Sequence, residues 1–370
     1  MRPWDRGLTS VILPAYNAAP YIREALQSVF DQTYPSFEII VVDDGSTDGT
    51  AEIVREYAAA DTRVTLVRQS NQGVGAARNT AIRHARGIYI APLDADDRWA
   101  PDKLQKQVAR MVAMGASAGL IYCWYRSING DGNVLGYSDR HTVEGRAPRA
   151  MLLRNLTGNA SVPLFRATTL KALGGYLTRA EQGGGQGFED WDLSLRVSER
   201  FDVGVVPDHL VDYRQAPHCM STNARSMSRS LAVVMDEARR RNPGIAPREF
   251  RWSKGNFYYY VTRRAFRWSK NSVDVRSLAL AVVADPIYLL NLQTYRMVGR
   301  SVVYWLTGGR IFCTRGRKVE AYPREGHGPA PRKNEPSEEE NASSVGQRLF
   351  GRIQSKRWSA VLLESAPEGV

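Results

Sequence analysis

The sequence of 370 residues contains few cysteines and no long apolar run. Its three cysteines are far apart, which excludes a disulfide framework and the paired spacing of a zinc site. No apolar stretch reaches the roughly 18–20 residues of a membrane-spanning helix, because the best candidate, Leu278–Leu292, is interrupted by Asp285 and Pro286. The first residues also lack the apolar segment of a secretory signal. These absences predict a cytoplasmic protein, with at most a peripheral position on the inner face of the plasma membrane.

The positive charge of the chain is unevenly distributed. Residues 251–370 contain 20 Lys and Arg against 10 Asp and Glu, which leaves 30 against 28 for residues 1–250. The segments 257–270 and 348–358 alternate aromatic with basic residues, a composition typical of an interfacial helix on anionic lipid. A helical packing domain with an ordinary solvated basic face explains them about as well. No nucleic-acid motif accompanies the charge, so nucleic acid is not an expected partner, and an anionic membrane surface is a candidate partner beside that alternative.

The first hundred residues alternate between apolar strands and amphipathic helices. Strands are predicted at 9–16, 37–50, 63–70 and 87–97, with helices at 20–33, 50–60 and 73–86. This order predicts an α/β fold with a mostly parallel sheet flanked by helices. Ligands bind beyond the carboxyl ends of such strands, where this sequence carries PAYN, DDGSTD, RQSNQG and LDADD. Four polar strand ends on one edge of the sheet predict a binding site.

The remaining chain divides by composition. Residues 1–225 form the sheet domain that carries the predicted site, and residues 226–312 have a mostly helical pattern. Residues 313–345 are rich in Pro, Gly and charged side chains, which predicts a disordered linker. Residues 346–370 form a basic amphipathic tail, so the fold includes a helical, basic C-terminal extension.

Three acids end the fourth predicted strand, at Asp94, Asp96 and Asp97. The period of a strand sends Asp94 and Asp96 to the same side, where their charges repel unless a cation lies beside them. Mg²⁺ and Mn²⁺ accept one or two carboxylates and complete their shell with water and substrate phosphates. The alternative is that the acids cap the helix expected near Pro101, and Asp97 fits that alternative best.

Blocks along the chain resemble the nucleotide-sugar domain of family 2 glycosyltransferases over residues 9–225. They are SVILPAYN, VVDDGSTDGT, GVGAARNT, PLDADD, ALGGY, GFEDWDL and YRQAPHCMS. The resemblance implies a GT-A fold and an inverting, metal-dependent glycosyltransferase with Mn²⁺ or Mg²⁺ as cofactor. Its donor would be a nucleotide sugar, expected to be a UDP-sugar, and its acceptor a hydroxyl of a glycan or lipid-linked molecule. The implied process is synthesis of a cell-surface polysaccharide or glycoconjugate.

The resemblance assigns the nucleotide site to the first two strand ends and the third helix. Pro14, Ala15 and Tyr16 would lie along the base, and Asp44 would accept a hydrogen bond from the uracil N–H. The alternative for Asp44 is a local turn with the serine two residues later. Arg78 would contact the nucleotide or its phosphates, and its alternative is a solvated helix residue.

The resemblance also assigns the metal and the base. Asp96 would coordinate the metal directly, while Asp94 would contact the ribose, or the metal through water. Asp190 would be the general base that takes the proton of the acceptor hydroxyl, with Glu189 beside it. The alternative is that these acids stabilise the start of the following helix.

Three further residues are weaker candidates for diphosphate or acceptor contacts. Trp191 would stack on a sugar or belong to the core, and Arg214 would meet the diphosphate or brace the base. His218 is an even choice between these roles and a structural one. Gly73 and Gly75 would let the backbone approach the ligand or form a tight turn.

Other functions are weighed against this one. A non-catalytic nucleotide-sugar or glycan-binding protein would not need the four acids Asp44, Asp94, Asp96 and Asp190. A sugar nucleotidyltransferase would need a basic, Gly-rich loop after the first strand, and LPAYNAAPY has neither feature. A dinucleotide oxidoreductase is disfavoured because G-x-G-x-x-G is absent there. Processive members of the resembled family usually carry a Gln-x-x-Arg-Trp motif and several membrane spans, and the expected absence of both favours transfer of one sugar at a time.

Overall fold

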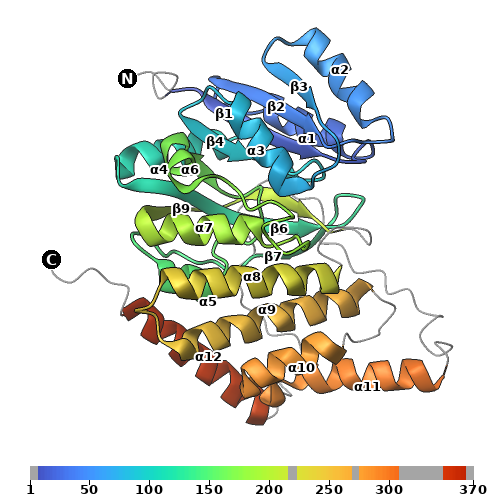
Figure 1. Cartoon of the computed structure of the whole chain (residues 1–370), viewed down its shortest axis with the longest axis vertical. Helices are drawn as coiled ribbons and strands as arrows, with labels where there is room; N and C mark the ends of the chain where they lie inside the picture. The colour runs from blue at the N-terminus through green and yellow to red at the C-terminus, as the bar shows by residue number, and fades with distance from the viewer. Residues whose placement is uncertain (1–6, 216–222, 269–274, 308–344, 364–370) are drawn as a thin grey trace.

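A computed structural model describes residues 7–215, 223–268, 275–307 and 345–363 (Figure 1). Its centre is a nine-stranded sheet in the order β3-β2-β1-β4-β8-β6-β9-β5, with β7 paired to β6. The strands are β1 Thr9–Ala15, β2 Phe37–Asp43, β3 Val64–Arg68, β4 Tyr89–Pro92, β5 Arg98–Trp99, β6 Ala118–Ile128, β7 Val134–Tyr137, β8 Leu164–Arg166 and β9 Asp202–Arg214.

The first four strands form the parallel half of the sheet. The crossovers between them are α1 Ile22–Phe30, α2 Thr50–Ala60 and α3 Val74–His84. Every residue of β1 and β2 is buried, because helices cover both faces of a parallel sheet and such strands are apolar on both sides. The register pairs Ala15 with Asp43 and Asp43 with Arg68, so the strand ends meet at one edge. The predicted order of elements is therefore confirmed.

The second half of the sheet is mixed. β8 is antiparallel to both β4 and β6, and β6 runs parallel to β9 over most of its length. Helix α4 (Lys103–Met114) packs on β6 and β9, α6 (Ala167–Leu173) follows β8, and α7 (Glu189–Arg200) contacts β6 and β9. The parallel order thus ends at β4, and the strands of the second half position α7 beside the carboxyl edge of the first.

A layer of helices lies against the end of the molecule opposite β1–β3 (Figure 1). Its members are α5 Pro148–Leu153, α8 Ala224–Arg241, α9 Pro247–Trp268, α10 Val275–Ala284, the 3₁₀ helix η3 Pro286–Leu290, α11 Leu292–Leu306 and α12 Val345–Leu363. Helix α9 packs on α5, α8 and α10, and α12 contacts α5 and η3. The predicted linker 313–345 lies outside the described residues except for Val345, while the predicted tail is helical as far as Leu363. Within the described ranges, no helix is long and apolar enough to cross a membrane.

Trp191 joins the sheet domain to this helical layer. Its side chain has no exposed surface, its ring centroid lies 4.5 Å from that of Phe257 on α9, and its Nε1–H donates to the Met151 carbonyl at 2.8 Å. Stacking on a ligand is therefore wrong for Trp191, because all of its surface is already used in the core. Trp99 is likewise a core residue, with its Nε1–H bound to the Ser161 carbonyl.

Candidate functional site

Asp44 organises the loop between β3 and α3. Its Oδ1 accepts hydrogen bonds from the Gln69 side chain and the Gln72 N–H, at 2.8 and 2.9 Å, and its Oδ2 accepts from the Gly73 N–H at 2.8 Å. The turn with Ser46, expected as the alternative for Asp44, is formed by Asp43 instead. Asp44 is thus a buried carboxylate at the edge where β1 and β2 end.

The residues expected along the base lie next to Asp44. The Asp44 N–H donates to the Ala15 carbonyl at 2.8 Å, which fixes the two strand ends together. Pro14 and Ala15 are buried in β1, whereas Tyr16 is 52% exposed at the mouth of this edge. Tyr16 therefore offers a free aromatic face beside a buried acceptor group.

Two glycines at the start of α3 have different roles. Gly73 has a φ of +90°, a conformation that favours glycine, and it makes the turn into the helix. A Cβ atom on Gly75 would lie 2.2 Å from the Leu177 carbonyl oxygen. The expected tight turn is at Gly73, while the close approach at Gly75 is to another part of the protein.

The three acids after β4 lie in a turn rather than in a strand. β4 ends at Pro92, and the Asp97 N–H donates to the Asp94 carbonyl at 3.0 Å. The expectation that Asp94 and Asp96 lie on one side of a strand is therefore wrong. Both side chains are half-buried, whereas Asp97 is fully buried. Capping by Asp97 is also wrong, because Asp102 is the N-cap residue of α4.

Asp97, Ser161 and Arg214 hold this acidic turn in place. Asp97 accepts from the Ser161 hydroxyl at 2.6 Å and from the Arg214 N–H at 2.8 Å. Ser161 in turn accepts from the Asp94 N–H, and the Arg214 Nε–H donates to the Asp96 carbonyl. Burial and the negative charges of Asp96 and Asp94 raise the pKa of Asp97 well above its usual range. The turn therefore concentrates negative charge on a rigid frame.

Arg214 has no exposed side-chain surface. Its guanidinium also donates to the carbonyls of Asn129 and Gly130, and it pairs with Glu24 at 2.8 Å. The prediction that Arg214 meets the diphosphate is wrong here, because the side chain is committed to bracing the acidic turn. His218, the companion candidate, lies outside the described residues.

Arg78 connects the acidic turn to the start of α7. Its Nη2 lies 2.6 Å from Asp94 Oδ1 and its Nη1 lies 2.9 Å from Glu189 Oε1. The side chain is 2% exposed, so the alternative of a solvated helix residue is wrong. The nearby carboxylates raise its pKa further, and the guanidinium stays charged despite its burial. One buried cation thus ties the acidic turn to Glu189, which lies 111 residues after Arg78 in the sequence.

Asp190 lies in the first turn of α7, beside this ion pair. Its Oδ1 accepts from the Trp191 N–H at 2.8 Å, and its side chain lines a cavity. Burial, and then the negative charge of Glu189, raise the pKa of Asp190 to about 7. Asp192, by contrast, is buried and forms ion pairs with Arg196 at 2.7 Å and Arg241 at 3.4 Å, which is a structural role. Asp190 is therefore the acid of this block whose proton affinity suits exchange near neutral pH.

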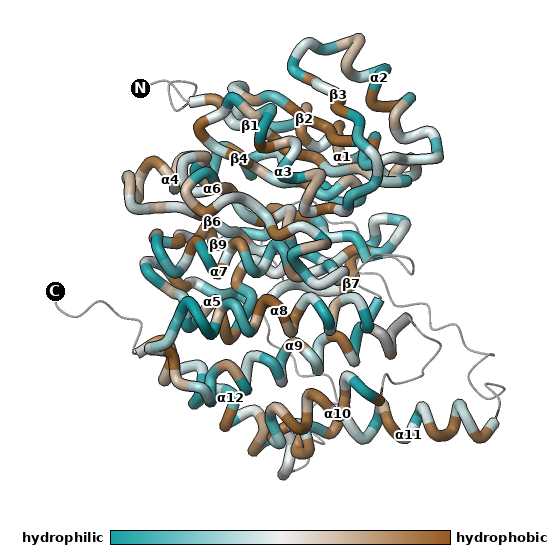
Figure 2. The backbone as a smooth tube through the Cα atoms, in the orientation of Figure 1, coloured by the Kyte–Doolittle hydropathy of each residue, from teal (hydrophilic) through white to brown (hydrophobic). Residues whose placement is uncertain are grey.

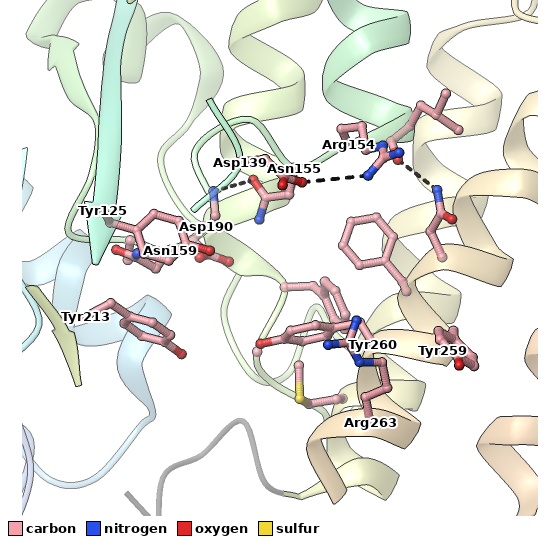
Figure 3. A pocket seen from close by; sticks show the side chains of 18 of the residues that line it. Tyr125, Asp139, Arg154, Asn155, Asn159, Asp190, Tyr213, Tyr259, Tyr260 and Arg263 are labelled. Carbon is pink, nitrogen blue, oxygen red and sulfur yellow. Dashed lines mark hydrogen bonds and ion pairs between the residues drawn. The ribbon is translucent and has the colours of Figure 1, made fainter. Parts of the chain in front are cut away.

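A cavity of about 470 Å³ extends from these acids toward the helical layer (Figure 3). Arg78, Asp94, Glu189 and Asp190 line one end. Figure 3 shows Tyr125, Asn159 and Tyr213 on the same side as Asp190, and Tyr259, Tyr260 and Arg263 of α9 on the other side. Arg154, which follows α5, also lines the cavity and pairs loosely with Asp139 at 3.8 Å. The cavity is thus walled by the sheet domain and by the C-terminal helices together.

Sequence reasoning missed the helical wall of this cavity. The aromatic and basic residues of 257–270 were a usable signal, which a membrane surface and a helical packing domain explained about equally well. The expected absence of Gln-x-x-Arg-Trp is wrong, because QSKRW at 354–358 has that pattern. Helix α12 brings Gln354 to the cavity and places Trp358 against His141, with ring centroids 5.2 Å apart. The expectation of single-sugar transfer therefore rests on the missing membrane spans alone.

The side chains present fit a weakly held divalent cation. Among the described residues, no group of three or more His, Cys, Asp or Glu side chains could hold a metal ion. Asp94 and Asp96 supply two carboxylates on the framed turn. Mg²⁺ and Mn²⁺ are often bound by one or two carboxylates together with substrate phosphates and water. A site of this composition would form fully only when a diphosphate is bound.

Comparison with known proteins agrees with this arrangement. The sequence model of "Glycosyl transferase family 2" matches residues 10–169. A Bacillus subtilis (strain 168) protein assigned to teichuronic acid biosynthesis as a glycosyltransferase is 37% identical over 196 residues, which are 50% of this chain and 75% of that protein. The chondroitin synthase of Escherichia coli is 33% identical over 192 residues, 52% of this chain and 26% of that one.

Solved structures share the fold at lower identity. S. aureus TarS 1–349 in complex with UDP-GlcNAc has a TM-score of 0.51 and 18% identity, over 78% of this chain and 91% of that one. A mannosyltransferase from Pyrobaculum calidifontis, in complex with GDP-Man and Mn²⁺, has a TM-score of 0.51 and 23% identity, over 84% of both chains. The GT-A fold that the sequence implied is confirmed. With the family match and a relative covered over three quarters of its length, this chain belongs to glycosyl transferase family 2.

Proposed function

We propose that this glycosyltransferase moves a sugar from a UDP-sugar to a hydroxyl of a glycan or lipid-linked acceptor, with inversion and with the help of Mn²⁺ or Mg²⁺. The observation that carries the proposal is the ion-pair bridge of Arg78, which holds Asp94 and Glu189 at one end of a cavity. A donor diphosphate beside Asp94 would then lie next to Asp190, the carboxylate that follows Glu189.

On the donor side, Tyr16 and Asp44 would bind the base. Tyr16 presents an exposed ring, and the ring N–H of uracil can donate a hydrogen bond to the Asp44 carboxylate. Asp96, with Asp94, would hold the divalent cation, which when bound offsets the negative charge of the departing diphosphate. Arg78 keeps Asp94 oriented, because its guanidinium is held from the other side by Glu189.

On the acceptor side, Asp190 would remove the proton from the attacking hydroxyl. Its pKa of about 7 means that the carboxylate is available near neutral pH and still binds a proton well. Attack on the anomeric carbon from the side opposite the diphosphate inverts the configuration, through a transition state with oxocarbenium character. Glu189 is a positioning residue, because it acts through Arg78.

The remainder of the cavity would bind the acceptor. Its wall combines aromatic rings, among them Tyr125 and Tyr260, with a few polar groups and the cations Arg154 and Arg263, a composition typical of ligand sites. Relatives whose names include teichuronic acid biosynthesis and chondroitin synthase support a polysaccharide or glycoconjugate acceptor. A cytoplasmic location, expected from the sequence, remains part of this proposal.

A thermal-shift screen tests the donor and metal assignments together. The purified chain is heated with UDP, GDP, dTDP or CMP, each with and without Mn²⁺. We expect UDP to raise the midpoint only when Mn²⁺ is present, because the nucleotide diphosphate completes the metal shell. Asp96→Ala should lose the Mn²⁺-dependent part, while Asp31→Ala, a change of an exposed acid on the sheet domain, should keep it.

Each outcome of this screen has a definite meaning. Stabilisation by another nucleotide would contradict the assignment of Asp44 to uracil and keep the transferase. A metal-dependent UDP shift of full size in Asp96→Ala would contradict the metal assignment. No response to any nucleotide would favour the non-catalytic alternative.

A further inference from the structure

The outer face of α10, η3 and α11 is apolar. Val275 and Val283 on α10 are 73% and 80% exposed, and Trp305 and Leu306 at the end of α11 are 80% and 68% exposed. Other large apolar side chains continue the face: Leu289, Tyr295, Val298, Val302 and Val303. Apolar stretches run along both helices at the end of the molecule farthest from β1–β3 (Figure 2). Isolated exposed apolar residues are ordinary, but several large ones gathered on three successive elements indicate an interaction surface.

The charge on this surface has one sign. From Val275 to Leu306 the sequence contains a single acid, Asp285, which is buried and paired with Arg357. The exposed charged residues over the same range are Arg276, Arg296 and Arg300. The surface is therefore apolar and positive, with no exposed carboxylate over that range.

The segments that the sequence singled out for lipid binding do not supply this surface. In 257–270, Phe257 and Tyr259 are buried in the core. In 348–358, Phe350 packs on Tyr288. These three aromatic side chains pack within the protein. The exposed apolar side chains of α10, η3 and α11 remain available to a partner.

We infer that the α10–η3–α11 face lies on an anionic lipid bilayer. A helix with an apolar face and flanking arginines binds in the plane of the interface, with the apolar side chains in the acyl boundary and the guanidinium groups near lipid phosphates. Trp305 suits this position because its ring is apolar and its N–H is polar. Charge complementarity decides for lipid, since the exposed charged residues of 275–306 are all arginines and suit a surface that is uniformly negative.

This surface is continuous with the wall of the cavity. η3 contributes Tyr288 to the cavity, while the neighbouring Leu289 is 49% exposed on the outer face. If the proposed function holds, the bilayer contact therefore lies next to the proposed acceptor site. A lipid-linked acceptor could then reach the cavity from the membrane. The lipid contact itself does not depend on the transfer reaction.

Co-sedimentation of the full chain with vesicles tests the inference. We expect binding to vesicles of phosphatidylcholine with phosphatidylglycerol, weaker binding at high salt, and little binding to pure phosphatidylcholine. The variant Trp305→Ser/Leu306→Ser should bind at least tenfold less, and Arg276→Glu/Arg296→Glu should lose the salt-sensitive part. The matched control is Ile88→Ser/Val112→Ser, which changes two exposed apolar residues of the sheet domain and should bind as the wild type does.

The variant Trp305→Phe tests whether residue 305 itself lies in the bilayer, because it keeps an aromatic side chain there. Brominated lipids should quench part of the wild-type tryptophan fluorescence, and Trp305→Phe should keep vesicle binding but lose that part of the quenching. The UDP thermal shift, measured on the same variants, should be unchanged, so a failure of lipid binding is distinguishable from a failure of the proposed function.

Three results would overturn the inference. One is a wild-type chain that does not sediment with anionic vesicles. Another is sedimentation that the α10–α11 variants leave unchanged. A third is a chain that is dimeric without lipid and becomes monomeric in Trp305→Ser/Leu306→Ser, which would assign the face to a second copy of the chain.

Discussion

The sheet domain and the helical layer differ in how far local sequence determines what a residue does. In the sheet domain, polar strand ends meet because parallel strands share an edge, so motifs far apart in the chain could be assigned to one site. In the helical layer, similar aromatic and basic patterns occur both on buried and on exposed faces. Which face is exposed depends on neighbours that the local pattern does not contain.

This difference matters for amphipathic helices in general. Residues 257–270 have the composition of an interfacial helix, yet Phe257 and Tyr259 are buried in the core and Tyr260 and Arg263 line a cavity. Helix α11, which the sequence did not single out, carries the exposed apolar face. An amphipathic pattern therefore predicts that a helix has a partner, and tertiary structure decides whether that partner is protein, ligand or lipid.

The largest expected effect separates catalysis in the sheet domain from binding in the helical layer. Asp190→Asn should lower the rate of sugar transfer by about 10²–10⁴-fold, because the acceptor hydroxyl loses its base. Nucleotide and vesicle binding should be unchanged, as measured by thermal shift and co-sedimentation. Asp192→Asn is the control, which should lower thermal stability and keep turnover per folded molecule, since Asp192 pairs with Arg196 and Arg241. Unchanged turnover in Asp190→Asn would remove Asp190 from the base role.

A change in the helical layer should affect stability and acceptor binding, whereas Asp190→Asn should affect turnover. Arg357→Met leaves Asp285 buried without its cation, which should cost roughly 3 kcal/mol of unfolding free energy and loosen α12 from the cavity. We expect a higher KM for the acceptor, with little change in the UDP thermal shift. Arg352→Met, at an exposed position of α12, is the matched control and should leave both quantities unchanged. Equal loss of nucleotide and acceptor binding would show that the two regions are not separable in this way.

The smallest expected effect is a displacement of the pH profile. With Asp190 as the proposed base, which acts only when unprotonated, kcat should rise with pH through about 7 and level off above it. Glu189→Gln removes a negative charge that raises the pKa of Asp190, so the rise should move to lower pH by on the order of one unit. Glu181→Gln, at an exposed position, should leave the profile in place. A rise that moves to higher pH would contradict the assigned cause.

The helices and strands of the sheet domain were predictable from local pattern and period, although period failed for Asp94 and Asp96, which lie in a turn after β4. The helix at Thr50–Ala60 has the expected bounds, and the strand ends meet as predicted. The supporting residues were not predictable, because Ser161 and the brace of Arg214 act through contacts between distant segments. Likewise, the burial of Arg78 depends on α7, which no local signal in AARNT reveals.

The bridge made by Arg78 has a consequence for synthesis of the chain on the ribosome. The parallel half of the sheet is complete by Pro92, but the guanidinium buried in it meets Glu189 only after another hundred residues have emerged. A buried charge that has lost one partner is costly, and contacts of such long sequence separation form slowly. A nascent chain that ends before α7 should therefore remain loosely folded around α3, and the two motifs become ordered as one cooperative unit.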